Sequence, residues 1–283
     1  LPMQDGEVDY TALDPLVDFF MEHGGYYFDT AYTYLNGKSE EAIRKAVVER
    51  KPRESFWIVD KLPGYKCKAK EDCNVYFEEQ RKRCGVEYFD VFMLHWLNDT
   101  NYRIAEECGE FAFLQELKES GRAKRIGFSY HDSAALLDEI LTAHPQVDYV
   151  QLQINYLDWE SPSIQARQCY ETAVKHGKKV IVMEPVKGAT LAKVPKEVEQ
   201  LLKTFEPAES IASHAIRFVQ SLPQVEICLS GMNEMAQMVD NMRDFTPITE
   251  EHKALLAKAA AMLKSSITVP CTGCGYCLKG CPK

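Results

Sequence analysis

The chain of 283 residues lacks an excess of positive charge: 33 Lys and Arg stand against 42 Asp and Glu, a formal net charge of −9. A nucleic-acid partner requires a basic face, so this balance argues against one. No apolar stretch approaches the roughly 20 residues that span a bilayer. The opening Leu-Pro-Met-Gln-Asp-Gly lacks the basic region and the apolar core of a secretory signal. We therefore expect neither nucleic acid nor membrane as a partner.

A disulfide framework is also lacking over most of the chain. The cysteines before residue 271 are scattered without regular spacing, at Cys67, Cys73, Cys84, Cys108, Cys169 and Cys228. Scattered cysteines are typical of a reducing compartment. The sequence therefore indicates a cytoplasmic protein.

The cysteines that remain are concentrated at the end of the chain. They follow the spacing C-x2-C-x2-C-x3-C-P, at Cys271, Cys274, Cys277 and Cys281. Bacterial ferredoxins hold a [4Fe–4S] cluster with this run, in which the fourth cysteine normally ligates a second cluster. A zinc site more often uses two Cys pairs about 15–20 residues apart, and a disulfide staple over such short loops would stabilise little. The spacing favours an iron–sulfur cluster, and with it an oxidoreductase or an electron carrier.

One unit recurs along the rest of the chain: an amphipathic helix, a glycine, and an apolar strand that ends in polar residues. Glycine after a helix takes the left-handed position at no Cβ cost, and Gly25, Gly85, Gly121 and Gly177 fit this role. Strands that are apolar on both faces and separated by helices indicate a parallel sheet covered by helices. Seven strands are predicted, at residues 26–29, 55–61, 88–95, 123–131, 148–155, 178–185 and 226–231.

Seven strands are one short of a (β/α)8 TIM barrel, an α/β fold. We expect the first strand to precede Leu1, on about 20 further residues. From residue 268 the composition changes to Pro, Gly and Cys, so we assign residues 1–267 to the barrel. Residues 268–283 would begin a small C-terminal ferredoxin-like iron–sulfur module that continues beyond Lys283, because Cys281 has no second cysteine run to join.

Active residues of such a barrel gather where its strands end. The strand ends carry Asp29, Lys61, His95, Ser129, Gln151, Glu184 and Ser230. Taken singly, Asp29 and Lys61 could form a buried structural ion pair, and His95 could be a hydrogen-bonded core imidazole. Charged groups are rarely buried without a partner, and three such residues at successive strand ends favour a functional site.

These residues resemble the aldo-keto reductases. The stretch Phe28-Asp29-Thr30-Ala31-Tyr32-Thr33-Tyr34 is similar to the family's signature, and Asp60-Lys61-Leu62 and Leu94-His95-Trp96 are similar to its lysine and histidine motifs. The resemblance extends from residue 1 to about 261. It implies a catalytic tetrad of Asp29, Tyr34, Lys61 and His95. It also implies a subgroup whose tail carries two cysteine runs, and hence two [4Fe–4S] clusters in the complete protein.

The tetrad suits carbonyl reduction. Tyr34 would be the general acid, and a free phenol with a pKa near 10 is a reluctant donor that a nearby Lys61 ammonium would improve. Asp29 would keep Lys61 charged, and His95 would orient the carbonyl. The loop 97–110 would border the substrate.

The resemblance also implies a nicotinamide cofactor, NADP or NAD, across the later strand ends. Ser129 and Gln151 would hold the carboxamide, with Asn155 close by. The remaining implied contacts are Glu184, Pro185, Val186, Lys187 and Gly188 along the pyrophosphate, and Ser230, Gly231, Met232, Asn233, Gln237 and Asn241 at the adenosine end. Gly231 and Gln237 stand where a basic pair usually clamps the 2′-phosphate, so the choice between the two cofactors stays open.

The sequence therefore predicts an oxidoreductase that reduces an aldehyde or ketone, or oxidises the alcohol, and exchanges electrons with a redox partner protein through its tail. Two alternatives stay open. One is a non-catalytic redox-sensing barrel, as in potassium-channel β subunits, and the other is an electron carrier whose barrel only docks partners.

Overall fold

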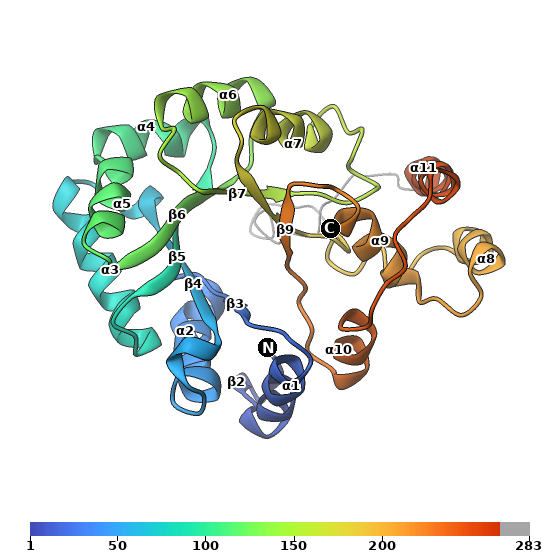
Figure 1. Cartoon of the computed structure of the whole chain (residues 1–283), viewed down its shortest axis with the longest axis horizontal. Coiled ribbons are helices and arrows are strands. Elements are labelled where there is room, and N and C mark those ends of the chain that lie inside the picture. Colours follow the sequence, from blue (N-terminus) through green and yellow to red (C-terminus); the bar gives the residue numbers. More distant parts are fainter. Residues whose placement is uncertain (267–283) are drawn as a thin grey trace.

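The computed structural model of the protein describes residues 1–266. Its centre is a seven-stranded sheet in which each strand pairs in parallel with the next along the chain. The strands are β3 (Tyr27–Asp29), β4 (Trp57–Leu62), β5 (Phe89–Leu97), β6 (Ala123–Tyr130), β7 (Tyr149–Gln153), β8 (Lys179–Met183) and β9 (Val225–Cys228). Figure 1 shows the sheet curling inside a ring of helices, with β3 and β9 as its edges. The seven predicted strands are confirmed.

The curled sheet has one apolar layer inside it and a larger one outside. The inner layer comes from alternate positions of five strands: Tyr27, Val59, Val91, Met93, Tyr149 and Ile181. The outer layer lies between the strands and the helices, and it holds most of the buried apolar residues. Strands that bury both faces read as continuous apolar runs, which is why the sequence pattern located them.

The longer helices are α1 (Tyr10–Glu22), α3 (Lys70–Cys84), α4 (Asp99–Glu107), α5 (Glu110–Glu119), α6 (Ala134–Ala143), α7 (Ala166–Lys175), α8 (Lys196–Phe205), α9 (Ile211–Gln220) and α11 (Glu250–Ser266). Of these, α8 and α11 lie outside α9 rather than on the sheet (Figure 1). The shorter ones are η1 (Tyr34–Gly37), α2 (Lys38–Ile43), η2 (Arg44–Val48), η3 (Arg53–Ser55), η4 (Gly64–Lys66) and α10 (Met235–Asn241). No helix among residues 1–266 is long and apolar enough to cross a membrane.

Glycines end three of the helices as expected. Gly85, Gly121 and Gly177 have φ values of 70°, 73° and 67°, the left-handed region that side chains with a Cβ disfavour. At the first copy of the repeated unit, Gly24 with φ 85° takes this role instead of Gly25.

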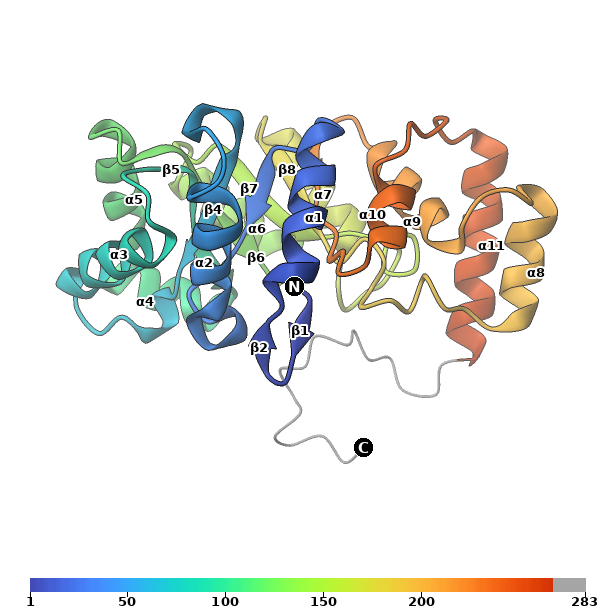
Figure 2. The same ribbon diagram turned by 90° about the horizontal axis from the view of Figure 1, so that it is seen from below.

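Two features at the ends of the strands differ from the sequence prediction or add to it. The expected loop 97–110 contains α4, because the Asn98 side chain accepts a hydrogen bond from the Asn101 amide and caps the helix. A hairpin of β1 (Met3–Gln4) and β2 (Glu7–Val8) projects at one end of the molecule (Figure 2). Lys38 of α2 holds the hairpin in place, because its Nζ donates to the Gly6 carbonyl at 3.0 Å and to the Glu7 carboxylate at 2.6 Å.

The eighth strand stays a prediction. The ferredoxin-like module and its cysteines Cys271, Cys274, Cys277 and Cys281 lie outside the described residues.

Candidate active site

Three neighbouring strands bring the predicted tetrad together. Asp29 is the last residue of β3, Lys61 lies near the end of β4, and His95 lies near the end of β5. Tyr34 begins η1, directly after β3. Because β3, β4 and β5 pair in parallel, their carboxyl ends meet at one edge of the sheet.

Lys61 is fully buried, and its ammonium is held by two oxygens. Its Nζ lies 2.5 Å from Asp29 Oδ2 and 2.7 Å from the Thr30 carbonyl. Burial alone would lower the pKa of Lys61, but Asp29 and Tyr34 outweigh it, so the pKa of Lys61 is raised. Lys61 is therefore a charged group in the interior of the sheet.

Tyr34 lies between Lys61 and His95. The Lys61 Nζ is 5.2 Å from the centre of the Tyr34 ring, and the Tyr34 and His95 rings meet edge to face at 5.7 Å. Lys61 lowers the pKa of Tyr34, as expected, but burial and the Asp29 charge outweigh it, so the pKa of Tyr34 stands above its ordinary value. The Tyr34 hydroxyl is therefore protonated and can donate its proton to an acceptor.

His95 is a neutral imidazole. Burial, followed by the charges of Lys61 and His131, lowers the pKa of His95 to about 3. Its Nδ1 is buried without a hydrogen-bond partner in the described part of the chain. A neutral ring with an unused nitrogen can contact a polar substrate atom.

The backbone is strained on both sides of this site. Leu35 and Asn36 follow Tyr34 with φ values of 51° and 56°, Trp96 follows His95 with φ 63°, and Glu184 follows β8 with φ 59°. A left-handed conformation costs a non-glycine residue of order 1 kcal/mol, and such residues cluster at functional sites. The strain therefore coincides with the residues proposed from the sequence.

Two further aromatic residues lie at the site, and sequence reasoning missed them. Tyr65, in η4, meets the Trp96 ring at 5.7 Å and the His95 ring at 6.3 Å. His131 follows β6, and burial lowers its pKa to about 4. The sequence did offer a signal for both: Tyr65 stands four residues after Lys61, and His131 stands two residues after Ser129.

The three residues expected at the carboxamide differ in how many of their polar atoms already have a hydrogen-bond partner. Ser129 Oγ accepts a hydrogen bond from the Trp96 amide at 2.7 Å. Gln151 Oε1 is buried and has no partner among residues 1–266, while its Nε2 faces Met183 Sδ at 3.5 Å. Asn155 is engaged on both sides, with Asp158 and with the Glu184 carbonyl. Gln151 thus offers an open acceptor, whereas Asn155 supports the loop beside it.

The loop after β8 is held by a buried ion pair. The Lys187 Nζ contacts both oxygens of Asp158, at 2.7 and 2.6 Å, and Lys187 and Ala189 have φ values of 48° and 73°. Pro185 is buried, Val186 is half-buried and Gly188 is exposed. The Glu184 Oε2 is buried and has no partner within residues 1–266. Lys187 therefore holds the loop in shape, and its charge is already balanced by Asp158.

The residues expected at the adenosine end lie after β9. Asn241 donates to Ser230 Oγ at 3.0 Å, and the Asn233 amide donates to Gln237 Oε1 at 3.0 Å. Gly231, Asn233 and Gln237 are exposed, and Met232 is half-buried. Arg243, the nearest cation along the chain, is paired with Glu209 and Asp240.

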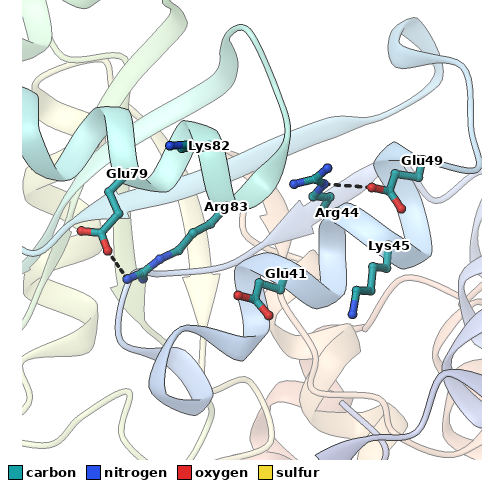
Figure 3. A pocket seen from close by; sticks show the side chains of 7 residues that line it. All are labelled: Glu41, Arg44, Lys45, Glu49, Glu79, Lys82 and Arg83. Atoms are coloured by element: carbon teal, nitrogen blue, oxygen red, sulfur yellow. Dashed lines mark hydrogen bonds and ion pairs between the residues drawn. The ribbon is translucent and has the colours of Figure 1, made fainter.

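A surface cavity of about 490 Å³ lies apart from the tetrad. Figure 3 shows its lining from α2, η2 with the residue after it, and α3: Glu41, Arg44, Lys45, Glu49, Glu79, Lys82 and Arg83. Its charges are mixed and largely paired with one another, as Arg44 with Glu49 and Arg83 with Glu79.

Comparison with known proteins agrees with this geometry. The model of the aldo/keto reductase family matches residues 2–261, so the chain belongs to that family. It is 26% identical over 190 residues to the 9,11-endoperoxide prostaglandin H2 reductase of Trypanosoma cruzi, covering 65% of this chain and 58% of that protein. The chain thus spans little more than half the length of this relative.

Solved structures show the same fold. An aldo-keto reductase from Bacillus halodurans is similar with a TM-score of 0.74 at 19% identity, over 89% of this chain and 88% of the other. A Klebsiella pneumoniae aldo-keto reductase, solved in complex with NADPH, has a TM-score of 0.71 at 19% identity, over 89% and 87%.

Proposed function

We propose that this protein reduces an aldehyde or ketone to the alcohol with a nicotinamide cofactor. The observation that carries the proposal is the contact of Lys61 Nζ with Asp29 Oδ2 at 2.5 Å, beneath a tyrosine and beside a neutral imidazole. Family membership supports it, and the Trypanosoma cruzi relative is named as a reductase.

The residues of the tetrad divide the proton chemistry among them. Tyr34 Oη gives its proton to the carbonyl oxygen as negative charge develops there. The Lys61 ammonium stabilises the tyrosinate that is left, and Asp29 keeps that ammonium charged. His95 is neutral and its Nδ1 is unused, so it can orient the carbonyl without competing for the proton. The nicotinamide supplies the hydride when bound.

The later strand ends fit a nicotinamide cofactor. Gln151 offers a buried oxygen without a donor to a carboxamide NH2. The loop 184–189 has a strained backbone, as is common where a protein binds a ligand. Ser129 would be the second carboxamide contact, and residues 230–241 would hold the adenosine end. The NADPH complex of the Klebsiella reductase supports a nicotinamide as the cofactor.

The tail would add electron transfer to the reductase. Cys271, Cys274, Cys277 and Cys281 have the spacing of a [4Fe–4S] ligand run. We therefore place the chain in a subgroup of the family with a C-terminal iron–sulfur domain, which exchanges electrons with a redox partner protein.

Steady-state kinetics with a panel of aldehydes and ketones, each with NADH and with NADPH, tests the reductase. We expect turnover with at least one pair. If both cofactors bind, as seen by thermal shift, and no carbonyl is turned over, the protein is a redox-sensing barrel and the proposal is wrong.

A further inference from the structure

Two buried carboxyl groups face each other on the outer side of β4. Glu40 of α2 and Asp60 of β4 are both 0% exposed. Their oxygens and the Cys84 thiol of α3 lie within 4.8 Å of one another. Two ionised carboxylates this close, away from water, repel each other strongly.

Within residues 1–266 the cation that contacts this pair is Arg83. Its Nη1 donates to Glu40 Oε2 at 2.9 Å, and its other nitrogen contacts Glu79 at the cavity wall (Figure 3). One guanidinium shared with Glu79 can balance one buried carboxylate but not two. The other carboxyl of the pair must therefore carry a proton.

The hydrogen bonds place that proton on Asp60. Glu40 Oε1 receives no donor from the described residues, although a buried acceptor normally has one. Asp60 Oδ1 already accepts from the Lys61 amide at 2.8 Å. A proton on the other oxygen of Asp60 supplies the missing donor to Glu40 and leaves Glu40 charged beside Arg83. Burial and the neighbouring Glu40 raise the pKa of Asp60, in agreement.

This proton lies next to the tetrad. Side chains alternate along a strand, so Asp60 faces the helices while Lys61 faces the inside. The Lys61 peptide is held on both sides, since its amide donates to Asp60 and its carbonyl accepts from Gln80 Nε2 at 3.0 Å. A negative charge on Asp60 raises the pKa of Tyr34, which makes Tyr34 a weaker acid.

We propose that Asp60 is a positioning residue for Lys61, kept protonated by sharing its proton with Glu40. The positioning role of Asp60 rests on the proposed reductase function. The proton shared between Asp60 and Glu40 does not depend on that function. On its own side of the sheet Asp60 faces Glu40 from α2 and the Cys84 thiol from α3, which donates to Asp60 Oδ2 at 3.6 Å. Arg83 and Glu79 of α3 lie beyond Glu40, and Lys61 and Tyr34 act on Asp60 electrostatically from the inner face. At alkaline pH Asp60 loses this proton, and two carboxylates then repel each other next to the Lys61 peptide. The repulsion disturbs the position of Lys61, so turnover falls at alkaline pH.

The proton is tested by infrared spectroscopy of the full chain at pH 7, without substrate. The Asp60→Asn variant should lose a carbonyl-stretch band of a protonated carboxylic acid. Asp90→Asn is the matched control, because Asp90 is equally buried on the adjacent β5 but is paired with Arg53 and Lys124. If Asp60→Asn loses no such band, Asp60 is ionised and the proposal is wrong.

The positioning role is tested by the pH dependence of kcat. Asn can accept from the Lys61 amide and donate to Glu40 but cannot ionise, so Asp60→Asn should move the alkaline decline of kcat up by at least about one pH unit. Glu40→Gln removes the charge that raises the pKa of Asp60 and should move it down. Asp60→Leu should lose at least about tenfold more kcat than Asp60→Asn.

An unchanged alkaline decline in both carboxamide variants, or equal kcat in the Asn and Leu variants, would overturn the positioning role. If the wild type turns over no carbonyl, the reductase proposal fails while the infrared result still decides whether Asp60 holds the proton.

Discussion

Lys61 Nζ and Asp29 Oδ2 lie 2.5 Å apart, with the lysine side chain fully buried and the aspartate 14% exposed. Removing one partner of a buried pair leaves an uncompensated charge. We therefore expect this pair to contribute to stability as well as to the proposed proton chemistry.

Asp29→Asn should therefore lower the free energy of unfolding by about 3 kcal/mol, because the Lys61 charge loses its partner. Urea denaturation measures the change. The control is Asp99→Asn, which breaks the exposed pair with Arg103 and should cost less than about 1 kcal/mol. Equal losses in the two variants would show that the Lys61 contact contributes no more than a surface pair.

Acid should destabilise the protein through a histidine pair in the helical layer. His214 Nδ1 and His252 Nε2 lie 2.8 Å apart, both buried, and burial followed by the His252 charge lowers the pKa of His214 to about 4. The unfolded chain, with an ordinary pKa of 6.5, binds more protons than the folded one between these values. Stability therefore falls as pH drops from about 7 to 4.

Equilibrium unfolding at several pH values measures that slope. His214→Gln should reduce the slope, because Gln does not titrate. The same slope in His214→Gln and wild type would contradict this origin of the acid sensitivity.

The protein should discriminate only weakly between NADH and NADPH. Gly231 and Gln237 carry no charge for a 2′-phosphate, and Lys187 and Arg243 are already paired with carboxylates. We expect NADH to bind at least comparably to NADPH in a fluorescence titration. A 10³-fold preference for NADPH, about 4 kcal/mol, would mean that one of these ion pairs opens to bind the phosphate.

Anaerobically purified protein should contain iron and sulfide and show a broad visible absorption that bleaches on reduction. Cys274→Ala should abolish that absorption and leave barrel folding intact. Cys228→Ala is the control, since Cys228 lies in β9. Zinc in place of iron in the anaerobic material would contradict the cluster.

Patterns along the chain were sufficient to predict the strands and the polar residues at their ends, whereas Tyr34 was named through the resemblance to the aldo-keto reductases. Apolar runs that end in Asp29, Lys61 and His95 identify strand ends, and parallel pairing then brings these ends together. The partner of Lys187 could not be predicted, because Asp158 is 29 positions away and no periodicity links them. The proton on Asp60 could not be predicted either, because it depends on Glu40 and Arg83, which belong to two different helices. The net pKa of Tyr34 also required the structure, because burial opposes Lys61.

The central claim is that Tyr34 donates the proton in carbonyl reduction, and Tyr34→Phe tests it most directly. The matched control is Tyr32→Phe, which removes a hydroxyl that donates to Glu79 outside the tetrad. With a carbonyl that the wild type reduces, we predict that Tyr34→Phe lowers kcat by about 10²-fold or more while cofactor binding persists, and that Tyr32→Phe keeps its turnover. Near wild-type kcat in Tyr34→Phe would contradict the account.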